Sequence, residues 1–499
     1  MGYLFLTGAT GLLGSYLLRD LLRAGQRLAV LVRPTKIAAA SQRIESLLAR
    51  WEKQAGYALP RPVVLEGDLS RPDLGLGDTL VEWASQHCDS VMHNAASLTF
   101  YGKSREGEPW QSNLEGTRHV LEFCRRAGIR QFHHVSTAYV CGQRKGRILE
   151  SELDVGQEHG NDYESSKFEA EKLVHAAEFL DAPTFYRPGI ILGDSKTGYS
   201  TTFHGFYVPL KLVAGLITKT AAIDTPPEMI LAGIRFASHR LKDVMNVNGK
   251  ERKNYVPVDW VSAVMTRIYA DPKHHGKTYH LTPRQTVPAS QTHEVIEQAF
   301  MKYLVLTSKA TSTTADWPKF EKFFLEQMAV YRTYWGDDPE FDFSNTDRAA
   351  ADLPCPELNT ERMMLMCRYA IESNFGWPRP PVVKPDLDLH DHLNGFTRVP
   401  LPAAGEGRVF LGLQVNGSGG GQWKIVMEKG HVVAVEQGLS PRCTATFYLH
   451  SNTFECLTTR RSTVQQAIDL GRVLIEGNGV PPGELARALQ SLVHRDLIS

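Results

Sequence analysis

The sequence predicts an α/β fold, a doubly wound parallel sheet covered by helices, followed by a smaller α+β region. Over roughly the first 190 residues, short apolar runs alternate with segments whose apolar residues recur at helical spacing. The apolar runs are almost continuous, which is typical of strands buried on both faces of a parallel sheet. After a proline-rich stretch, short strand-like runs separated by glycine and asparagine turns predict the second region.

Six strands are expected in the first region, with helices between them. The strands are 3–9, 27–33, 62–68, 90–96, 131–137 and 183–189. The helices are 14–25, 39–56, 111–128 and 164–180. Several of these helical patterns end in glycine, which commonly terminates a helix. Strands and helices that alternate in this order predict helices on both faces of the sheet.

The chain is expected to divide into four segments. Residues 1–290 form the first domain, in which the less regular part after residue 195 is a small substrate lobe over the strand ends. Residues 291–376 are a helical extension rich in aromatic residues. Residues 377–394 begin with "WPRPPVVKPDLD" and form a linker. Residues 395–499 form an α+β domain of a common size.

Composition and charge argue against several classes of protein. Lysine plus arginine and aspartate plus glutamate both number 55, which gives no indication of nucleic acid as a partner. No long apolar run predicts a membrane span, and the first residues lack the basic start of a signal peptide. The seven cysteines include no Cys-x-x-Cys pair, which favours reduced thiols in a cytoplasmic protein. Zinc-ligand spacing is absent as well, so no metal site is expected.

The segment "LFLTGATGLLGSYLL" places Gly8, Gly11 and Gly14 between the first expected strand and the first helix. In a dinucleotide site of the Rossmann type, the first glycine permits a tight turn and the second lets the backbone approach the pyrophosphate. The third lets the helix pack closely on the strand. Free N–H groups and the positive end of the helix dipole then meet the phosphates. The loop therefore predicts a bound dinucleotide.

The ends of the next strands indicate which dinucleotide binds. The second strand ends in Val32 and Arg33, with Lys36 close by, where an NAD site usually has a carboxylate. A guanidinium can pair with a 2′-phosphate, so NADPH is the expected cofactor and NADH the alternative. Asp68 can accept a hydrogen bond from the adenine amino group. The residues expected to bind the cofactor are Thr7, Gly8, Thr10, Gly11, Leu12, Gly14, Arg33, Lys36, Asp68, Leu69, Asn94, Ala95, Ala96, Ser136, Tyr163, Lys167, Arg187, Pro188, Gly189 and Ile190.

Tyr163 and Lys167 in "NDYESSKFEAEKL" are four residues apart and lie on one face of the expected helix. A free tyrosine has a pKa near ~10, which makes it a poor acid or base at neutral pH. A nearby ammonium favours the phenolate and is expected to lower that pKa. Alone, the pair fits a solvated helix face equally well, because short Tyr-x-x-x-Lys matches arise by chance.

Seven motifs in order decide between these interpretations. "TGATGLLG", "GDL", "HNAAS", "SNLEGT", "VSTAYVCG", "YESSK" and "RPGIILGDSKTG" have the order and spacing of the extended short-chain dehydrogenase/reductase superfamily, which the chain resembles. "GDSKTG", "NYVPVDW" and "DPEFDFSN" look like its fatty acyl-CoA reductase and thioester reductase branch. The resemblance covers about residues 1–375. It implies that Thr137, Tyr163 and Lys167 are catalytic, with Ser136 the neighbouring hydroxyl, and that Asn113 supports the lysine or the proton path.

The C-terminal segment resembles sterol carrier protein type two. The resemblance rests on "GRVFLGLQVNGSGGGQWKIVMEKG", on "SNTFECL" and on the closing "GRVLIEGN". It implies an apolar tunnel for a lipid or an acyl chain. The alternative is that this domain only packs against the rest of the chain or mediates dimers, because a fold does not determine a function.

Together these resemblances imply an oxidoreductase that acts on a lipophilic carbonyl compound, first of all an acyl thioester. A keto/hydroxy reductase of a lipophilic small molecule is the alternative. An epimerase or dehydratase that keeps its cofactor bound, and a lipid-binding protein with a vestigial reductase fold, are the others. An acyl carrier protein is a candidate partner, and a homodimer stays open. A groove for a phosphopantetheine or coenzyme A arm needs cations at its mouth, and the candidates are Lys211, Lys219, Arg235 and Arg240.

Overall fold

The computed structural model of this chain describes residues 2–35, 38–212, 214, 248–305, 322, 325–376, 389–394, 407–416, 420–477 and 480–494. Its main feature is a seven-stranded sheet in the order β3-β2-β1-β4-β5-β7-β11, in which all neighbours are parallel. The strands are β1 Tyr3–Thr7, β2 Leu28–Val32, β3 Val63–Glu66, β4 Cys88–His93, β5 Gln131–Val135, β7 Thr184–Pro188 and β11 Thr278–Leu281. The predicted doubly wound fold is confirmed, and all six expected strands are present.

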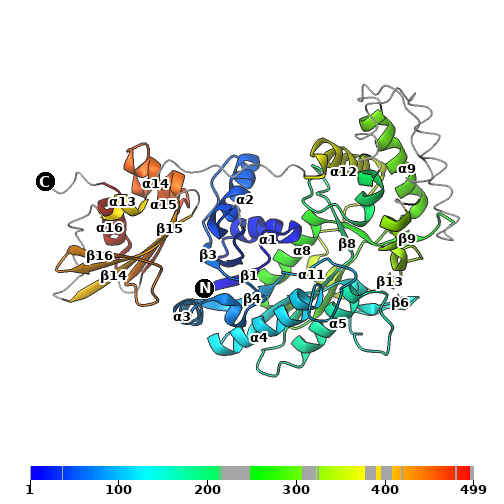
Figure 1. Cartoon of the computed structure of the whole chain (residues 1–499), viewed down its shortest axis with the longest axis horizontal. Helices are drawn as coiled ribbons and strands as arrows, with labels where there is room; N and C mark the ends of the chain where they lie inside the picture. Colours follow the sequence, from blue (N-terminus) through cyan, green and yellow to red (C-terminus); the bar gives the residue numbers. More distant parts are fainter. Residues whose placement is uncertain are drawn as a thin grey trace.

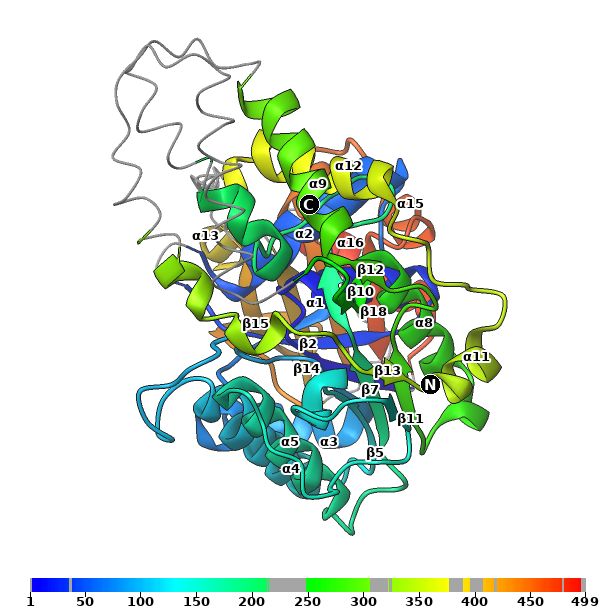
Figure 2. The ribbon, with the colours of Figure 1, turned by 90° about the vertical axis from the view of Figure 1, so that its right-hand side faces the viewer.

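Helices cover both faces of this sheet (Figures 1 and 2). One face packs against α1 (Leu12–Arg23), α2 (Ala40–Ala55) and α8 (Val258–Ala270). The other packs against α3 (Asp78–His87), α4 (Gly116–Ala127) and α5 (Asp162–His175). A π-helical turn, Gln111–Glu115, leads into α4. The apolar stripes of these helices and the apolar strands form two core clusters, one on each side of the sheet, as their periodicity predicts.

Part of the region after residue 195, which was expected to form a small separate lobe, belongs to the main sheet and its helices. Helix α8 packs on α1, and β11 adds a seventh strand to the main sheet, so both belong to the first domain. The sequence gives no clear signal for β11 because the strand has only four residues and no regular pattern around it. The proline-rich segment 377–388 lies outside the described residues.

A lobe over the carboxyl ends of the strands is formed mainly by later residues. It contains α9 (Ala289–Phe300), α12 (Thr360–Glu372) and the short helices Gly205–Tyr207 and Arg332–Tyr334. Three small sheets join it to the main domain. They pair β8 (Ile190–Leu192) with β10 (Tyr255–Pro257), β9 (Arg252–Lys253) with β12 (Val287–Pro288), and β6 (Arg147–Ile148) with β13 (Glu340–Phe341).

A second sheet, in the order β16-β15-β14-β17-β18, forms the C-terminal domain. Its strands are β14 Arg408–Asn416, β15 Gly421–Glu428, β16 His431–Gln437, β17 Ala445–His450 and β18 Val473–Gly477. Alternate residues such as Leu411, Leu413 and Val415 face an apolar cluster shared with α14 (Ser451–Thr458), α15 (Val464–Asp469) and α16 (Pro482–Val493). The short helix α13 (Leu389–Asn394) joins this cluster. The strand-like runs "GRVFLGLQVNG", "GQWKIVMEKG", "HVVAVEQG" and "CTATFYLHS" correspond to β14 to β17, and β18 is an additional strand.

In the described part of the chain, no helix has both the length and the apolar character needed to cross a membrane.

Helix α1 packs so closely on the glycine turn that a side chain at Gly14 is expected to lower stability. A Cβ on Gly14 would lie 1.9 Å from the carbonyl oxygen of Gly8. We expect Gly14→Ala to lower the free energy of unfolding by about 1–3 kcal/mol or more, because helix and turn would have to separate within a packed core. Gly407→Ala is the control, since nothing lies within 4 Å of its added Cβ. Urea unfolding measures both variants, and equal stability of the two would contradict this role of Gly14.

Candidate active site

A cavity of about 850 Å³ runs along the carboxyl ends of the strands of the main sheet. One end is lined by the glycine loop between β1 and α1 and by the ends of β2 and β3. The other end lies under the lobe, where side chains from 202–209, 249–255, 289–296 and 328–335 complete the wall. In open parallel sheets, ligands bind at this edge, because the loops that follow the strands gather there.

The glycine loop has the shape that a pyrophosphate requires. Gly8 has a positive φ of 72°, and a Cβ there would meet the backbone of Ala95 at 2.7 Å. A Cβ on Gly11 would meet only the Gly8 carbonyl oxygen, at 3.4 Å, so the backbone at Gly11 is open toward the cavity. Helix α1 begins after Gly11 with no side-chain cap, which leaves its first N–H groups for a ligand. The residues present therefore fit a dinucleotide.

A buried histidine that the sequence analysis missed holds this loop against β4. His93 lies between two hydroxyl groups, with Nδ1 2.8 Å from Thr7 Oγ1 and Nε2 3.0 Å from Thr117 Oγ1. Thr7 Oγ1 also accepts the backbone N–H groups of Asn94 and Ala95, so its own proton points to Nδ1. Burial, and then the charge of Lys167, lower the pKa of His93 to about 3, so the ring is neutral. His93 opens the motif "HNAAS", but the motif gives it no role, because its partners Thr7 and Thr117 are far away in sequence.

Two arginines lie at the end of the cavity that the glycine loop lines. Arg33, at the end of β2, is exposed and places Nη1 3.7 Å from Asp68 Oδ2. Arg43, on the first turns of α2, donates to Thr10 Oγ1 at 2.9 Å and to the carbonyl of Arg33. Asp68 Oδ1 accepts the backbone N–H and the hydroxyl of Ser70. No sequence pattern marks Arg43, because a cation in the first turns of a helix is usually a solvated surface residue.

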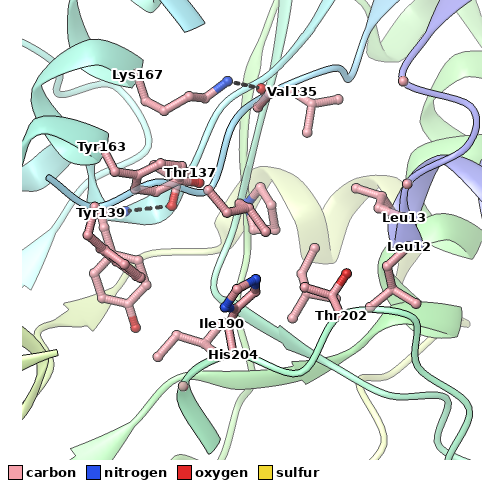
Figure 3. A pocket seen from close by; sticks show the side chains of 18 of the residues that line it. Leu12, Leu13, Val135, Thr137, Tyr139, Tyr163, Lys167, Ile190, Thr202 and His204 are labelled. Carbon is pink, nitrogen blue, oxygen red and sulfur yellow. Dashed lines mark hydrogen bonds between the residues drawn. The ribbon is translucent and has the colours of Figure 1, made fainter. Parts of the chain in front are cut away.

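The three residues with an expected catalytic role meet at the middle of the cavity (Figure 3). Thr137 follows β5 and caps the short helix Ala138–Cys141 by accepting the backbone N–H of Tyr139, and its side chain lies beside that of Tyr163 (Figure 3). Lys167, four residues after Tyr163 on α5, is buried and donates from Nζ to the carbonyl of Val135 at 2.6 Å. Asn161 caps α5 by accepting the backbone N–H of Glu164, which sets where this helix starts. The pair thus reaches from one helix toward the end of β5.

The pKa of Tyr163 differs from the sequence-based expectation. Burial raises it to about 12, the neighbouring Thr137 side chain lowers it, and the charge of Glu164 raises it. The expectation of a lowered pKa is wrong for this structure, because desolvation of the phenol outweighs the effects that favour the phenolate. Burial lowers the pKa of Lys167 to about 8, against the opposing effect of Glu171. At neutral pH the site therefore holds a neutral phenol and a largely charged lysine.

Asn113 does not line the cavity, although the motif predicts that it supports the lysine or the proton path. It is buried in the π-helical turn, where its Oδ1 accepts the N–H of Ser97 at 2.8 Å. Its Nδ2 donates to the carbonyl of Ser97 at 3.2 Å and to Ser166 Oγ at 3.0 Å. The observed role is to join the loop after β4 to α5, the helix that carries Tyr163 and Lys167.

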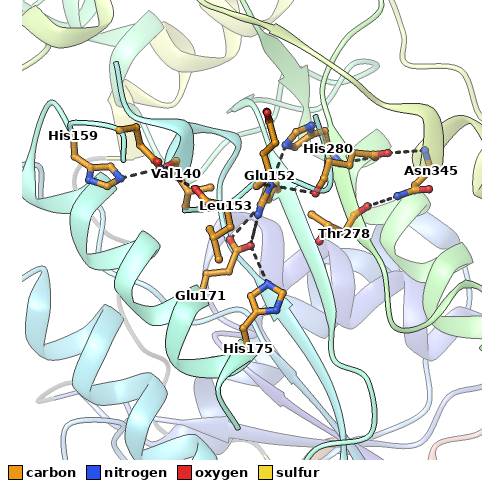
Figure 4. A network of polar contacts seen from close by, with 12 residues as sticks. Val140, Glu152, Leu153, His159, Glu171, His175, Thr278, His280 and Asn345 are labelled. Atoms are coloured by element: carbon orange, nitrogen blue, oxygen red, sulfur yellow. Dashed lines mark hydrogen bonds and ion pairs between the residues drawn. The ribbon is translucent and has the colours of Figure 1, made fainter. Parts of the chain in front are cut away.

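Arg187, which was expected to bind the cofactor, does not line the cavity. It is almost fully buried, lies away from the cavity wall and makes a bidentate pair with Glu171 on α5, with Nη2 to Oε1 at 2.6 Å and Nε to Oε1 at 3.0 Å. Nη1 also donates to the carbonyl of Glu152 at 2.8 Å, so the guanidinium is part of a buried polar network around Glu171 (Figure 4). Successive strand residues point to opposite sides of the sheet, so Arg187 and its neighbour Pro188 differ in direction.

The other predicted cofactor residues are placed together. Lys36 lies outside the described residues, so the structure does not test it. The predicted residues that line the cavity are Thr7, Gly8, Thr10, Gly11, Leu12, Gly14, Arg33, Asp68, Leu69, Asn94, Ala95, Ala96, Ser136, Thr137, Tyr163, Lys167, Pro188, Gly189 and Ile190. Residues from seven separate segments thus meet in one cavity.

Aromatic rings form the wall next to Tyr163 under the lobe. The ring of Phe100 lies 5.9 Å from that of Tyr163, 5.2 Å from Tyr331 and 5.4 Å from Tyr334. Tyr139, whose ring is 5.3 Å from that of Tyr334, is held by a 2.7 Å hydrogen bond to Asp338. The sequence signal for this wall is the aromatic stretch "YRTYWGDDPEFDFSN". This end of the cavity suits an apolar, planar group beside Tyr163.

The structure places none of the four cations that were expected at the mouth of a phosphopantetheine or coenzyme A groove in the described cavity wall. Lys219, Arg235 and Arg240 lie outside the described residues. Lys211 is exposed and is not part of the cavity wall. It lies close enough to His204, which does line the cavity, to help burial lower the pKa of that histidine.

Comparison with known proteins identifies the family. The profile of the NAD-binding family described as male sterility protein matches residues 6–265, slightly more than half of the chain. The non-canonical nonribosomal peptide synthetase FrzA of Cladobotryum sp is 29% identical over 303 residues, 56% of this chain and 26% of that protein. The aldehyde reductase lnaA of Aspergillus flavus is 28% identical over 302 residues, with the same shares. The chain thus spans about a quarter of the length of these two curated relatives.

Solved structures agree in fold. The terminal R domain of the myxalamid PKS-NRPS pathway is 25% identical, with a TM-score of 0.57, and the match covers 76% of this chain and 93% of that domain. A thiolation-reductase di-domain of an archaeal non-ribosomal peptide synthetase has a TM-score of 0.54 at 18% identity, over 75% of this chain and 76% of that one. The second likeness shows the fold alone.

If Arg187 is a buried partner of Glu171 and not a cofactor ligand, its replacement should lower stability and leave cofactor binding nearly unchanged. Arg187→Met would leave the Glu171 carboxylate buried without its main partner, so we expect the free energy of unfolding to fall by about 3–5 kcal/mol. Affinity for the dinucleotide should stay within about twofold in the protein that remains folded. Chemical denaturation and a cofactor titration measure the two quantities.

Arg130→Met is the matched control, because Arg130 pairs with Asp181 on the exposed surface and should matter little. A variant Arg187→Met that keeps its stability but loses the cofactor would restore the original assignment of Arg187 as a cofactor ligand.

Proposed function

We infer the function from one premise, that this chain belongs to the NAD-binding family described as male sterility protein. We propose that it is a nicotinamide-dependent reductase that converts an acyl thioester to an aldehyde, with further reduction to the alcohol as a second step. The observation that carries this proposal is the meeting of Thr137, Tyr163 and Lys167 in the cavity that the glycine loop also lines. The names of the R-domain structure and of the aldehyde reductase support the reaction class.

The chemistry follows from the protonation states of the site. A nicotinamide held by the glycine loop and Lys167 would supply a hydride to the carbonyl carbon of the thioester, and charge would develop on the carbonyl oxygen as its π bond opens. Thr137 and Tyr163 are next to each other and can both hydrogen-bond that oxygen. Tyr163 then donates its proton, which needs the neutral phenol that burial maintains. The resulting hemithioacetal loses the thiol and leaves the aldehyde, so one hydride and one proton, together two electrons and two protons, enter per aldehyde formed.

Lys167 acts through position and charge. Its ammonium, held by the Val135 carbonyl at the end of β5, lies in the wall shared by the glycine loop and Tyr163. When Tyr163 gives up its proton, the nearby positive charge stabilises the phenolate relative to the phenol. Because Lys167 is desolvated, this interaction is stronger than it would be in water.

We propose NADPH as the preferred cofactor. The end of β2 carries Arg33 and no carboxylate, and α2 adds Arg43 beside Thr10 in the same wall. Two guanidinium groups can pair with a 2′-phosphate. A site for NADH would instead have a carboxylate here to accept the ribose hydroxyls. Asp68 is engaged by Ser70 and Arg33, which leaves it less suited to replace that missing carboxylate.

The substrate is proposed to be a lipophilic acyl group on a thiol carrier, either coenzyme A or an acyl carrier protein. The ring-lined wall around Phe100, Tyr331 and Tyr334 supports an apolar acyl group. The name of the thiolation-reductase structure supports a carrier protein as a partner.

The likeness of residues 395–499 to sterol carrier protein type two stays a proposal, supported by a sheet with helices around one apolar cluster. The domain lies at the opposite end of the molecule from α9 and α12 (Figure 1). We therefore place the reacting acyl group under the lobe and not inside this domain.

Turnover separates the proposed reaction from its main alternative. With NADPH, we expect long-chain acyl-CoA to be reduced with release of free thiol, and lipophilic ketones to be reduced poorly or not at all. Nicotinamide absorbance and a thiol assay measure the two products. Reduction of ketones without reduction of any thioester would make the chain a keto reductase.

Tyr163→Phe is the control for the chemistry. It removes the proton donor but keeps the ring, so we expect kcat to fall by about 10²-fold or more, with cofactor affinity nearly unchanged. Retained activity in this variant would contradict the role of Tyr163.

The buried lysine predicts a pH dependence. Burial lowers the pKa of Lys167 to about 8, so its charge is present below that pH and lost above it. We expect kcat/KM for reduction to fall as pH rises through about 8, since kcat/KM reports groups of the free enzyme. Lys167→Arg should be less active but should lose this descending limb, because arginine keeps its charge. A wild-type profile that stays flat from pH 7 to 10 would show that the charge of Lys167 is not needed.

A further inference from the structure

The C-terminal domain is packed on the edge of the main sheet. Figure 1 shows it beside α2, β3 and the N-terminal strand, on the side away from the lobe. Edge strand β3 has one side without a neighbouring strand, and unpaired edge groups are usually covered or blunted in native proteins. Here Gln422 Nε2 donates to the carbonyl of Val64 at 3.2 Å, and Asn416 Nδ2 donates to the carbonyl of Pro62 at 3.4 Å. Side chains of the second sheet thus satisfy acceptors at the edge of the first.

The contact uses the face of the second sheet that its sequence pattern marks as polar. Leu411, Leu413 and Val415 face the helices, so Gln414 and Asn416 face the other way, yet both are almost fully buried. Tyr448 from the same face packs in the core cluster of the first domain. A polar sheet face is normally solvated, and burial of its hydrogen-bonded side chains indicates a lasting contact between the domains.

Glu476 adds a charged anchor to this contact. Its Oε1 accepts Arg27 Nη2 at 2.7 Å, and its Oε2 accepts the hydroxyls of Tyr3 at 3.2 Å and Tyr448 at 3.1 Å. The carboxylate of one domain is therefore bound by two residues of the other and one of its own. Partly buried, charge-assisted bonds of this kind are stronger and more directional than surface ion pairs.

The third contact reaches helix α2. Glu45 is buried, with Oε1 3.3 Å from Arg61 Nε and Oε2 3.4 Å from Nε2 of His450 on β17. Burial, and then the charge of Arg61, lower the pKa of His450 to about 4, so at neutral pH its ring is neutral and can donate a single N–H to Glu45. The C-terminal domain thus supplies one of the two cationic or polar side chains that lie next to the Glu45 carboxyl.

Arg43 is two residues before Glu45 on the same helix, with its guanidinium at Thr10 in the cofactor cavity. One side of α2 is therefore fixed by the C-terminal domain, and another carries a cation to the adenosine end of the cavity. Because a helix turn is rigid, a shift of Glu45 would move Arg43 with it.

We propose that the C-terminal domain is a fixed brace for α2, in which His450, through Glu45, positions Arg43 and so sets the preference for a dinucleotide with a 2′-phosphate. His450 is a positioning residue that touches no cofactor. The inference rests on the proposed use of NADPH, and it gives the C-terminal domain a role in cofactor selection whether or not that domain also holds a lipid.

The test measures dissociation constants for NADPH and NADH by fluorescence titration of the full-length protein and its variants. Arg43→Ala should reduce the ratio Kd(NADH)/Kd(NADPH) by about tenfold or more, as expected for loss of a bond to a charged group. His450→Ala should reduce the same ratio by about three- to tenfold, and its effect should largely disappear in the Arg43→Ala background, because the two residues act in series. His450→Gln keeps an N–H donor and should restore most of the ratio.

Val433→Ala is the control within the same domain, since this side chain is half exposed on β16. It should leave both constants unchanged. Equal weakening of both cofactors by His450→Ala would indicate general loss of structure and would overturn the brace. An unchanged ratio in His450→Ala, with a wild type that clearly prefers NADPH, would overturn it as well. A wild-type ratio near one would instead contradict the assignment of NADPH itself.

Discussion

The hydrogen bond from the Lys167 ammonium to the carbonyl of Val135 is the interaction on which the rest of the site depends. It brings a positive charge into a desolvated position at the end of β5, which carries a large cost unless partners compensate. Glu171, one helical turn further along α5, is the next charge, and Arg187 on β7 completes the series. Positive, negative and positive groups alternate through the core, so each buried charge has an opposite neighbour.

This arrangement explains why several motif residues are not ligands. Arg187 holds Glu171, and Asn113 joins the loop after β4 to α5, so both act on the position of the helix and not on the reacting atoms. His93 has a similar role at the other end, where it fixes the glycine loop to β4. The reacting groups are few, and a larger set of buried polar residues holds them in place.

The two ends of the cavity differ in chemistry because different parts of the chain build them. The adenosine end is polar and cationic, and it belongs to the first strands and α2. The end beside Tyr163 is aromatic, and the lobe supplies most of its rings. The phenol of Tyr163 lies between them, and burial there keeps it protonated, as a proton donor in a reduction requires.

Local pattern was enough to predict the strands, the helices, the glycine loop and the residues Thr137, Tyr163 and Lys167, since each depends on neighbours in sequence or on a motif of fixed spacing. It was not enough for Arg43, His93, the direction of Arg187 or the raised pKa of Tyr163, because each depends on groups brought from distant segments. The strand β11 was missed because it has only four residues and no regular pattern around it.

From the sequence alone, this chain is expected to have a doubly wound dinucleotide domain with a Tyr–Lys pair on one helix, followed by a second small domain. Periodicity and glycine placement act over a few residues, and so they can be read along the chain. The packing of the whole chain is needed to show that the polar face of the second sheet covers the edge strand β3, that Glu45 and His450 meet, and that Lys167 is bonded to Val135. Such contacts depend on how whole layers pack, and burial of polar groups is decided by that packing.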